Sequence, residues 1–255
     1  MPHFSRWPSH GLSSASLMLS TLAQNPRLPL NQTRLDGEDF REQPVALCGK
    51  VFIAHWSGAL YWPAEDALII SDLHLGEDTP LTRTHDTLAR LAAALDMTPA
   101  STVIALGDGL SMAAGRLAAA DLDVLRILQE ERDWIWITGD TDRTIAQRLG
   151  GHVLEQLTVS GLTLRTVPAL GRVTHEIAGH LHPAARVSRR GHTVLRPCFA
   201  GNGRRLILPA FGAPSGGLNI LDAAFEPLFG HDGMHVWMLG HEGLYPIASR
   251  LLRGE

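Results

Sequence analysis

Aspartate and histidine side chains recur in this sequence directly after short apolar segments, where they could bind a metal ion. The first cluster is Asp72-Leu73-His74, and later clusters contain Asp108, Asp140 and the unit His180-Leu181-His182. Carboxylate oxygens and imidazole nitrogens are ligands for divalent metals, and one carboxylate can bridge two ions about 3.5–4 Å apart. These residues therefore predict a site for one or two divalent ions.

Each of these clusters follows a segment with the pattern of a β-strand. The expected strands are 67–71, 102–106, 133–138 and 174–178, and leucines at helical spacing predict helices between the first three of them. Such βαβαβ order predicts a mainly parallel sheet with right-handed crossovers. Because ligands bind beyond the carboxyl ends of the strands in an open α/β sheet, the four clusters should converge.

The spacing within each cluster has a backbone requirement. Alternating side chains in a DxH or HxH unit face one side only if the backbone is extended through the unit. Glycine precedes Asp108, Asp140 and His180, and is expected to permit a sharp turn and a close backbone approach there. Asp142 is expected to cap a helix that starts near Thr144 rather than to bind metal.

The second half of the chain is expected to contain only strands, because its apolar segments are short and separated by turn residues. A β-sheet that closes on the first sheet is therefore predicted, which gives an α/β fold. Trp134 and Trp136 alternate on one expected strand and should belong to the core. The strands expected in this half are 152–159, 162–166, 174–178, 193–195, 206–208, 218–221 and 235–239.

Bulk composition limits the partners that the chain can recruit. With a formal net charge of -4 and a pI near 6.3, it has no global basic field to attract nucleic acid. Any contact with DNA or RNA must therefore depend on a local patch. The pairs Arg189-Arg190 and Arg204-Arg205 could steer a phosphodiester backbone, although a solvated hairpin surface is the alternative explanation for them.

Cysteine usage and hydropathy predict a cytoplasmic protein. Cys48 and Cys198 are far apart and form no CxxC unit, which argues against a disulfide scaffold or a thiolate zinc site, although one long-range disulfide is left open. No apolar run reaches the roughly 18 residues that a membrane helix needs. Residues 1–45 are rich in Pro and Ser without periodicity and are expected to form a poorly ordered extension, followed by one domain over 46–255.

The order DxH, GD, GDxD and GHxH, each after a strand, resembles that of the calcineurin-like metallophosphoesterases. Over about residues 45–221 the chain is more narrowly similar to the ligase-associated DNA damage response endonucleases known as PdeM. This resemblance implies an α/β/β/α sandwich with two facing mixed sheets, DNA as the substrate, and a DNA ligase or helicase as a partner. It depends on the segments ALYWPAEDALIISDLHLGE, DWIWITGDTD, EIAGHLHPAARV and LRPCF, and on RRLILPAFGAPSGG.

The resemblance also implies a role for each candidate ligand, and all six ligands are expected to be catalytic. The first metal would be held by Asp72, His74, Asp108 and His182, with Asp108 bridging to a second metal. The second metal would also take Asp140 and His180. Mixed imidazole and carboxylate ligands make Mn²⁺ the expected ion.

Four positions depart from the pattern of the resembled family. Asp140 replaces an Asn, Thr141 replaces the His that approaches the leaving group, and Ser111 ends the GDxx unit. The stretch that begins at Thr166 lacks the lone His that precedes a Glu-Pro pair. His175 lies in the same interval, but a packed or surface His is the more common explanation for it.

The sequence thus predicts a metal-dependent phosphoesterase that hydrolyses phosphodiesters through a metal-activated water. Two other functions stay open. A degenerate, non-catalytic chain that binds metal or phosphate in a repair complex is favoured by Thr141 and Thr166. A hydrolase of small nucleotides or phosphomonoesters fits the motifs equally well.

Overall fold

The computed structural model describes the residues that follow the N-terminal segment, with several short gaps. Residues 1–39, the candidate ligands Asp108 and Asp140, and the positions Ser111, Thr141 and Asp142 lie outside the described residues, so the expectations placed on them stay predictions. The described ranges are 40–76, 84–98, 100–107, 117–138, 148–171, 175–189, 191–212, 216–229, 233–241 and 243–254.

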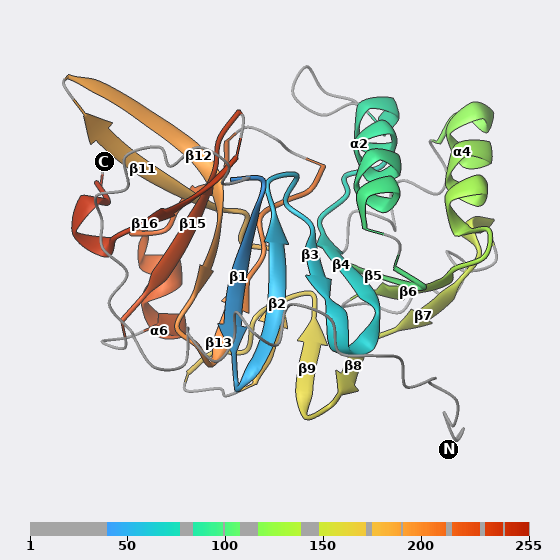
Figure 1. Cartoon of the computed structure of the whole chain (residues 1–255), viewed down its shortest axis with the longest axis horizontal. Helices are drawn as coiled ribbons and strands as arrows, with labels where there is room; N and C mark the ends of the chain where they lie inside the picture. The colour runs from blue at the N-terminus through green and yellow to red at the C-terminus, as the bar shows by residue number, and fades with distance from the viewer. Residues whose placement is uncertain are drawn as a thin grey trace. The chain divides into compact units, whose positions relative to one another are not determined.

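The first sheet has seven strands in the order β1-β2-β3-β4-β5-β6-β7 (Figure 1). Its first half is antiparallel, and β4 to β7 are parallel to one another. All five residues of β4 and of β5 are buried, as expected for parallel strands covered on both faces. The strands are β1 (Glu42–Leu47), β2 (Lys50–His55), β3 (Leu60–Trp62), β4 (Ala67–Ser71), β5 (Thr102–Leu106), β6 (Asp133–Ile137) and β7 (His152–Leu154).

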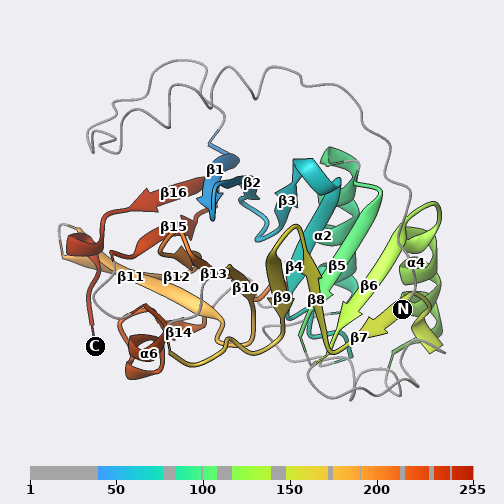
Figure 2. The same cartoon turned by 90° about the horizontal axis from the view of Figure 1, so that it is seen from below.

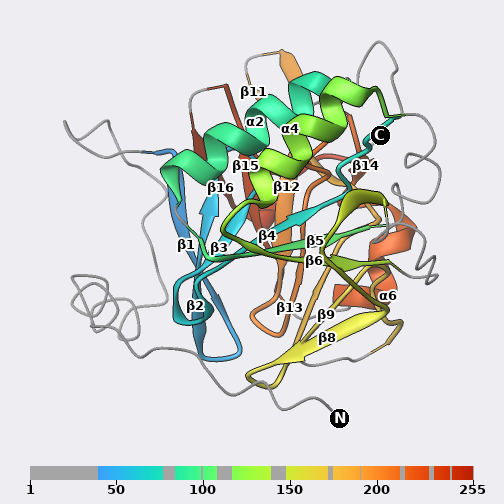
Figure 3. The ribbon, with the colours of Figure 1, turned by 90° about the vertical axis from the view of Figure 1, so that its right-hand side faces the viewer.

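Helices α2 (Thr84–Met97) and α4 (Ala119–Gln129) cover the outer face of this sheet (Figure 3). Helix α2 is amphipathic, and its buried Leu88, Leu91 and Leu95 recur at the spacing of one helical face. They pack in one cluster with Trp134 and Trp136 of β6, which confirms the core assignment of both tryptophans.

The second sheet follows the order β14-β11-β12-β13-β10-β9-β8, and β15 pairs with β12 and with β16. Its strands are β8 (Gln156–Val159), β9 (Leu162–Arg165), β10 (Glu176–Ala178), β11 (Pro183–Arg189), β12 (His192–Gly201), β13 (Arg205–Ile207), β14 (Leu218–Asn219), β15 (His235–Leu239) and β16 (Leu244–Ile247).

The two sheets face each other across an apolar core. Phe52, Trp62 and Ile104 of the first sheet pack in one cluster with Leu164 and Phe199 of the second. A further cluster covers the outer face of the second sheet, where Phe225 and Phe229 lie on a short 3₁₀ turn and on α6 (Glu226–Phe229). Figure 2 shows α6 beside β14 and β11, away from α2 and α4. The layers are α/β/β/α with two mixed sheets, which confirms the expected fold class.

Several details differ from the sequence expectation. The single strand expected at 152–159 is divided at Glu155 into β7, which pairs with β6, and β8, which pairs with β9 in the other sheet. Strand β1 begins at Glu42, so the sheet starts inside the segment expected to be an extension. Cys48 and Cys198 are free thiols, so the disulfide that was left open is not formed.

Within the part of the chain that the structure describes, no helix is long and apolar enough to cross a bilayer.

Candidate metal centre

Asp72 is the central side chain of the site and comes directly after β4. It is 2% exposed, and its backbone NH donates to the Leu106 carbonyl at the end of β5 at 2.7 Å. One carboxylate oxygen, Oδ2, accepts hydrogen bonds from Ser71 Oγ at 2.5 Å and from the His180 NH at 2.9 Å. The same oxygen lies 3.6 Å from His182 Nε2. The carboxyl ends of β4 and β10 therefore converge on this carboxylate, as expected, although the two strands belong to different sheets.

The surroundings of Asp72 keep its carboxyl group ionised. Burial alone would raise its pKa, but His182 lowers it through its hydrogen bond and charge, and Ser71 and the His180 NH lower it further. These opposing effects leave the pKa below the ordinary carboxyl value. A metal ligand must be deprotonated, so this environment suits Asp72 for that role.

Two imidazoles stand beside this carboxylate. The ring centroids of His74 and His182 lie 4.9 Å apart in an edge-to-face arrangement. The His182 side chain is 32% exposed, and His180 is an exposed residue that reaches Asp72 through its backbone. The structure thus brings together Asp72, His74, His182 and the backbone of His180.

The backbone at both motifs is left-handed rather than extended. Asp72 and His74 have φ values of 49° and 50°, and His180 and His182 have φ values of 69° and 43°. The expected extended conformation through the DxH and HxH units was wrong. Each non-glycine residue in this region is conformationally costly, and such residues cluster at functional sites where the surrounding structure holds them. A sharp left-handed bend, rather than strand alternation, turns these side chains toward one another.

Two glycines give the carboxylate room, as the sequence predicted. Gly107 has φ 133°, and a Cβ there would lie 2.7 Å from Asp72 Oδ1. A Cβ on Gly179 would overlap Ser71 Oγ and lie 2.8 Å from Asp72 Oδ2. Larger side chains at either position would displace the carboxylate.

We expect Gly179→Ala to destabilise the fold by about 1–3 kcal/mol, the range for inserting a methyl group into packed structure. The cause would be steric, because the φ angle of Gly179 is outside the left-handed region. Urea unfolding would measure the change. Gly233→Ala is the matched control, since a Cβ there meets no atom within 4 Å. Equal midpoints for the two variants would contradict the prediction.

The sequence did not predict the backbone contacts that fix the DxH and HxH motifs. Phe211 and Gly212 donate their NH groups to the carbonyls of Ser71 and Asp72 at 2.7 and 2.9 Å. Leu218 donates to the His182 carbonyl at 2.9 Å. A Cβ on Gly212 would overlap the Leu73 carbonyl. Two glycines of this segment, Gly212 and Gly217, therefore lie against the backbone of the two motifs.

Ser71 and Arg90 were also missed. Ser71 is fully buried at the end of an otherwise apolar strand, and this isolated polar residue was the available signal. Arg90 of α2 donates to the Phe211 carbonyl and stacks over the Phe211 ring at 5.4 Å from its centroid. Its partner is distant in sequence, so the sequence carried no signal for it.

Thr166, which stands in place of the lone His of the resembled family, makes a structural contact. It is buried, and its hydroxyl donates to the Ile137 carbonyl at the end of β6 at 2.8 Å. His175 does not replace the missing ligand, because it precedes β10 at the end opposite to His180. Its backbone bonds with Arg204 and Thr163 instead.

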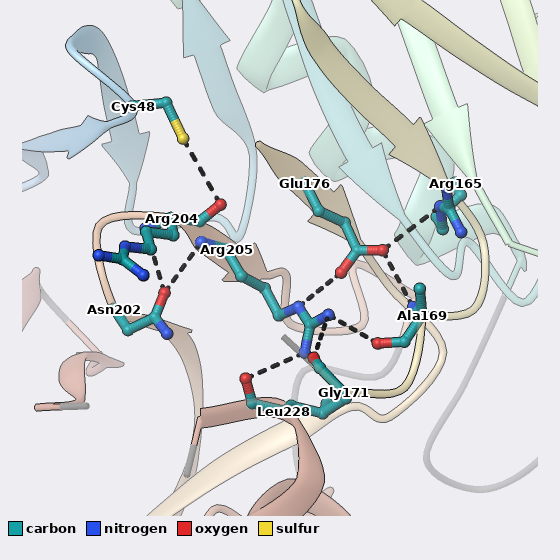
Figure 4. Close-up of polar contacts among 9 residues, drawn as sticks. All are labelled: Cys48, Arg165, Ala169, Gly171, Glu176, Asn202, Arg204, Arg205 and Leu228. Atoms are coloured by element: carbon teal, nitrogen blue, oxygen red, sulfur yellow. Dashed lines mark hydrogen bonds and ion pairs between the residues drawn. The ribbon is translucent and has the colours of Figure 1, made fainter. Parts of the chain in front are cut away.

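Arg205 is not a steering residue, which corrects one half of the expected basic pair. Its side chain is fully buried, with Nε 2.5 Å from Glu176 Oε2, and its other nitrogens donate to main-chain carbonyls that include those of Leu228 and Ala169 (Figure 4). Arg204 is exposed. The Arg204-Arg205 pair therefore divides between solvent and core.

The donor chemistry of the centre fits a divalent metal. A buried ionised carboxylate and two neighbouring imidazoles are oxygen and nitrogen ligands that suit Mn²⁺, Fe²⁺ or Zn²⁺. Asp72 Oδ1 faces Gly107, and the candidate ligand Asp108 follows this glycine in the chain. Among the described residues alone, no group of three or more His, Cys, Asp or Glu side chains could hold an ion. The complete ligand set, with Asp108 and Asp140, stays a prediction.

The α/β fold with two mixed sheets matches a metallophosphoesterase nuclease structure. That structure is Pseudomonas putida nuclease MPE, with a TM-score of 0.64 and 26% sequence identity, over 81% of this chain and 100% of that chain. No protein-family model matches the sequence, and no curated protein matches it.

Proposed function

We propose that this chain is a metal-dependent phosphodiesterase that cleaves DNA, with Mn²⁺ as its preferred ion. The observation that carries the proposal is the buried Asp72 carboxylate, held by Ser71 and the His180 NH, beside His182 in a fold that matches a nuclease. The sequence resemblance to the ligase-associated endonucleases supports the same substrate and a DNA ligase or helicase as a partner.

Asp72, His74 and His182 would hold the ion, together with Asp108, and Asp140 and His180 would complete the set. A divalent metal bound by these residues supplies Lewis acidity toward the phosphoryl group and lowers the pKa of water. The chain itself contributes fixed geometry. Ser71 and the His180 NH fix one oxygen of Asp72, and the segment from Phe211 to Leu218 holds both motifs in place.

One observation favours a second candidate, a non-catalytic chain that binds metal or phosphate in a repair complex. Thr166 stands where the resembled family has a ligand, and its hydroxyl is used to bond the end of β6. A reduced ligand set could bind one ion without supporting hydrolysis.

Turnover with defined substrates tests the proposal. The natural chain, loaded with Mn²⁺, would be assayed against a labelled single-stranded DNA oligonucleotide, a chromogenic phosphodiester and a chromogenic phosphomonoester. We expect cleavage of both diesters, and its loss with EDTA. Faster hydrolysis of the monoester would favour the small-substrate alternative. Bound Mn²⁺ without hydrolysis of any substrate would contradict the proposal and favour the non-catalytic one.

A further inference from the structure

The His180-Leu181-His182 motif lies in a segment of the chain that has several arginines and no acidic residue. Between Glu176 and Asp222 the sequence contains no Asp or Glu, although the whole chain has a net charge of -4. Most of the cations of this segment lie in the residues that follow His182. The arginines of the segment are Arg186, Arg189, Arg190, Arg196, Arg204 and Arg205.

Strands β11 and β12 form a long antiparallel hairpin within this segment. Strand β11 begins at Pro183, directly after the site residue His182, and pairs with β12 up to Arg189 opposite His192. Figure 1 shows the hairpin in orange, with its far end projecting beyond the neighbouring strands. The hairpin therefore extends continuously from the metal centre into solvent.

The register places two arginines and a histidine on one face of the hairpin. Arg189 is opposite His192, and Arg196 is opposite Ala185. Because alternate residues of a strand share a face, and opposed residues share it across the ladder, Arg189, His192 and Arg196 lie on the same face. Val194 lies between His192 and Arg196 on this face of β12, and Val187 is opposite it on β11.

This surface is exposed, and its charge is not neutralised. Arg189 and His192 are exposed, and Val194 is 42% exposed. Arg196 Nη2 lies 2.7 Å from His241 Nε2, and neither Arg189 nor Arg196 forms an ion pair with a carboxylate of the described residues. The cations therefore remain available to an anion.

We propose that this hairpin face, defined as Val187, Arg189, His192, Val194 and Arg196, binds the phosphate backbone of a nucleic-acid strand that leads to the metal centre. The inference rests on the proposed function, because it assigns the surface that holds the substrate. Cations bind a polyanion chiefly by releasing condensed counterions, and Val194, which is 42% exposed, offers apolar contact to bases.

The length of the hairpin sets the length of strand that it can bind. The first three residues of β11 are buried, so the accessible face extends only from Arg196, which is opposite Ala185, to Arg189. These four residue steps span about 13 Å at a rise of about 3.3 Å per residue. At about 3.4 Å per nucleotide of a stacked strand, that span matches roughly four nucleotides. Affinity should therefore rise with oligonucleotide length up to about four to six nucleotides and then level off.

Salt-dependent binding tests the proposal. Fluorescence anisotropy would report binding of labelled single-stranded DNA with slowly cleaved phosphorothioate linkages to the Mn²⁺-loaded chain. We expect Arg189→Gln to weaken binding about 3- to 10-fold and to lower the slope of log affinity against log salt by about 0.7. Arg189 is the first choice because it is exposed and its side chain forms no ion pair with a carboxylate of the described residues. Arg196→Gln should lower the slope by a similar amount.

Arg126→Gln is the control, since Arg126 is an exposed arginine of α4 that pairs with Asp123 at the surface. Unchanged slopes for Arg189→Gln, or equal changes in all variants, would overturn the proposal. It would also be overturned if polyglutamate of matched charge competed as well as DNA, or if the natural chain did not bind DNA. If DNA bound with the expected salt dependence but was not hydrolysed, the proposed catalytic function would be contradicted, whereas the proposed binding surface would be supported.

Discussion

The variant Asp72→Asn is expected to lower phosphodiester hydrolysis by more than about 100-fold and to weaken Mn²⁺ binding. Changing a residue that only orients a metal ligand costs about 10- to 100-fold, and Asp72 is proposed to be a ligand itself. The substitution keeps the size of the side chain but removes its negative charge. An amide also presents only one oxygen to the donors that now share Oδ2, which are Ser71 Oγ and the His180 NH.

Steady-state hydrolysis of a chromogenic phosphodiester and calorimetric titration with Mn²⁺ would measure both effects. Asp123→Asn is the matched control, because Asp123 is an exposed carboxylate whose ion pair with Arg126 contributes little to stability. We expect this control to keep the activity and metal affinity of the natural chain. If Asp72→Asn kept its activity within threefold of the natural chain, the assignment of Asp72 as a metal ligand would be wrong.

Much of the first sheet could be predicted because its signals are local. Strands β4 and β5 are continuous apolar runs, and both are buried at every position. The rule that ligands gather at the carboxyl ends of parallel strands then placed Asp72 near His180 and His182, although they are far apart in sequence. The His180 NH does contact Asp72, but the two strand ends meet across the facing sheets, because β10 belongs to the second sheet and not to the sheet of β4.

The geometry within the motifs could not be predicted in the same way. Strand alternation explained the DxH spacing, whereas Asp72 and His74 adopt left-handed φ angles. Non-local contacts hold this conformation, with Gly107 and Gly179 against the carboxylate and Gly212 against the Leu73 carbonyl. No local propensity encodes contacts of this kind, which form only when the sheets have assembled.

The two arginines of the Arg204-Arg205 pair look equivalent in the sequence, but they have different environments. Arg205 begins β13 and points into the core, where Glu176 at the start of the parallel strand β10 meets it. The partner lies on another strand, so charge patterning along the chain could not reveal the pair. A buried arginine requires such a partner, because an unpaired buried charge is strongly destabilising.

Removing one member of this buried pair is expected to have the largest effect on stability in the molecule. Both side chains are fully buried, and Arg205 also bonds the Leu228 and Ala169 carbonyls (Figure 4). Arg205→Met would leave the Glu176 carboxylate without its buried partner, with the partly exposed Arg165 at 3.3 Å as the remaining cation beside it. The Leu228, Ala169 and Gly171 carbonyls would lose this donor. Breaking a buried ion pair in this way costs about 3–5 kcal/mol. Glu176→Gln removes the carboxylate from the buried Arg205, but it should cost less, because a glutamine oxygen can still accept from the Ala169 NH.

Urea unfolding of both single variants and the double variant would test whether the two charges act together. If they do, the double variant should lose less stability than the sum of the singles, by about 1 kcal/mol or more, because it contains no unpaired buried charge. Arg126→Met removes the exposed pair with Asp123 and should change stability by less than about 1 kcal/mol. If Arg205→Met cost no more than Arg126→Met, the buried pair would not be a major source of stability. Strict additivity would instead show that each side chain acts through its own main-chain contacts, since paired charges in a core must be coupled.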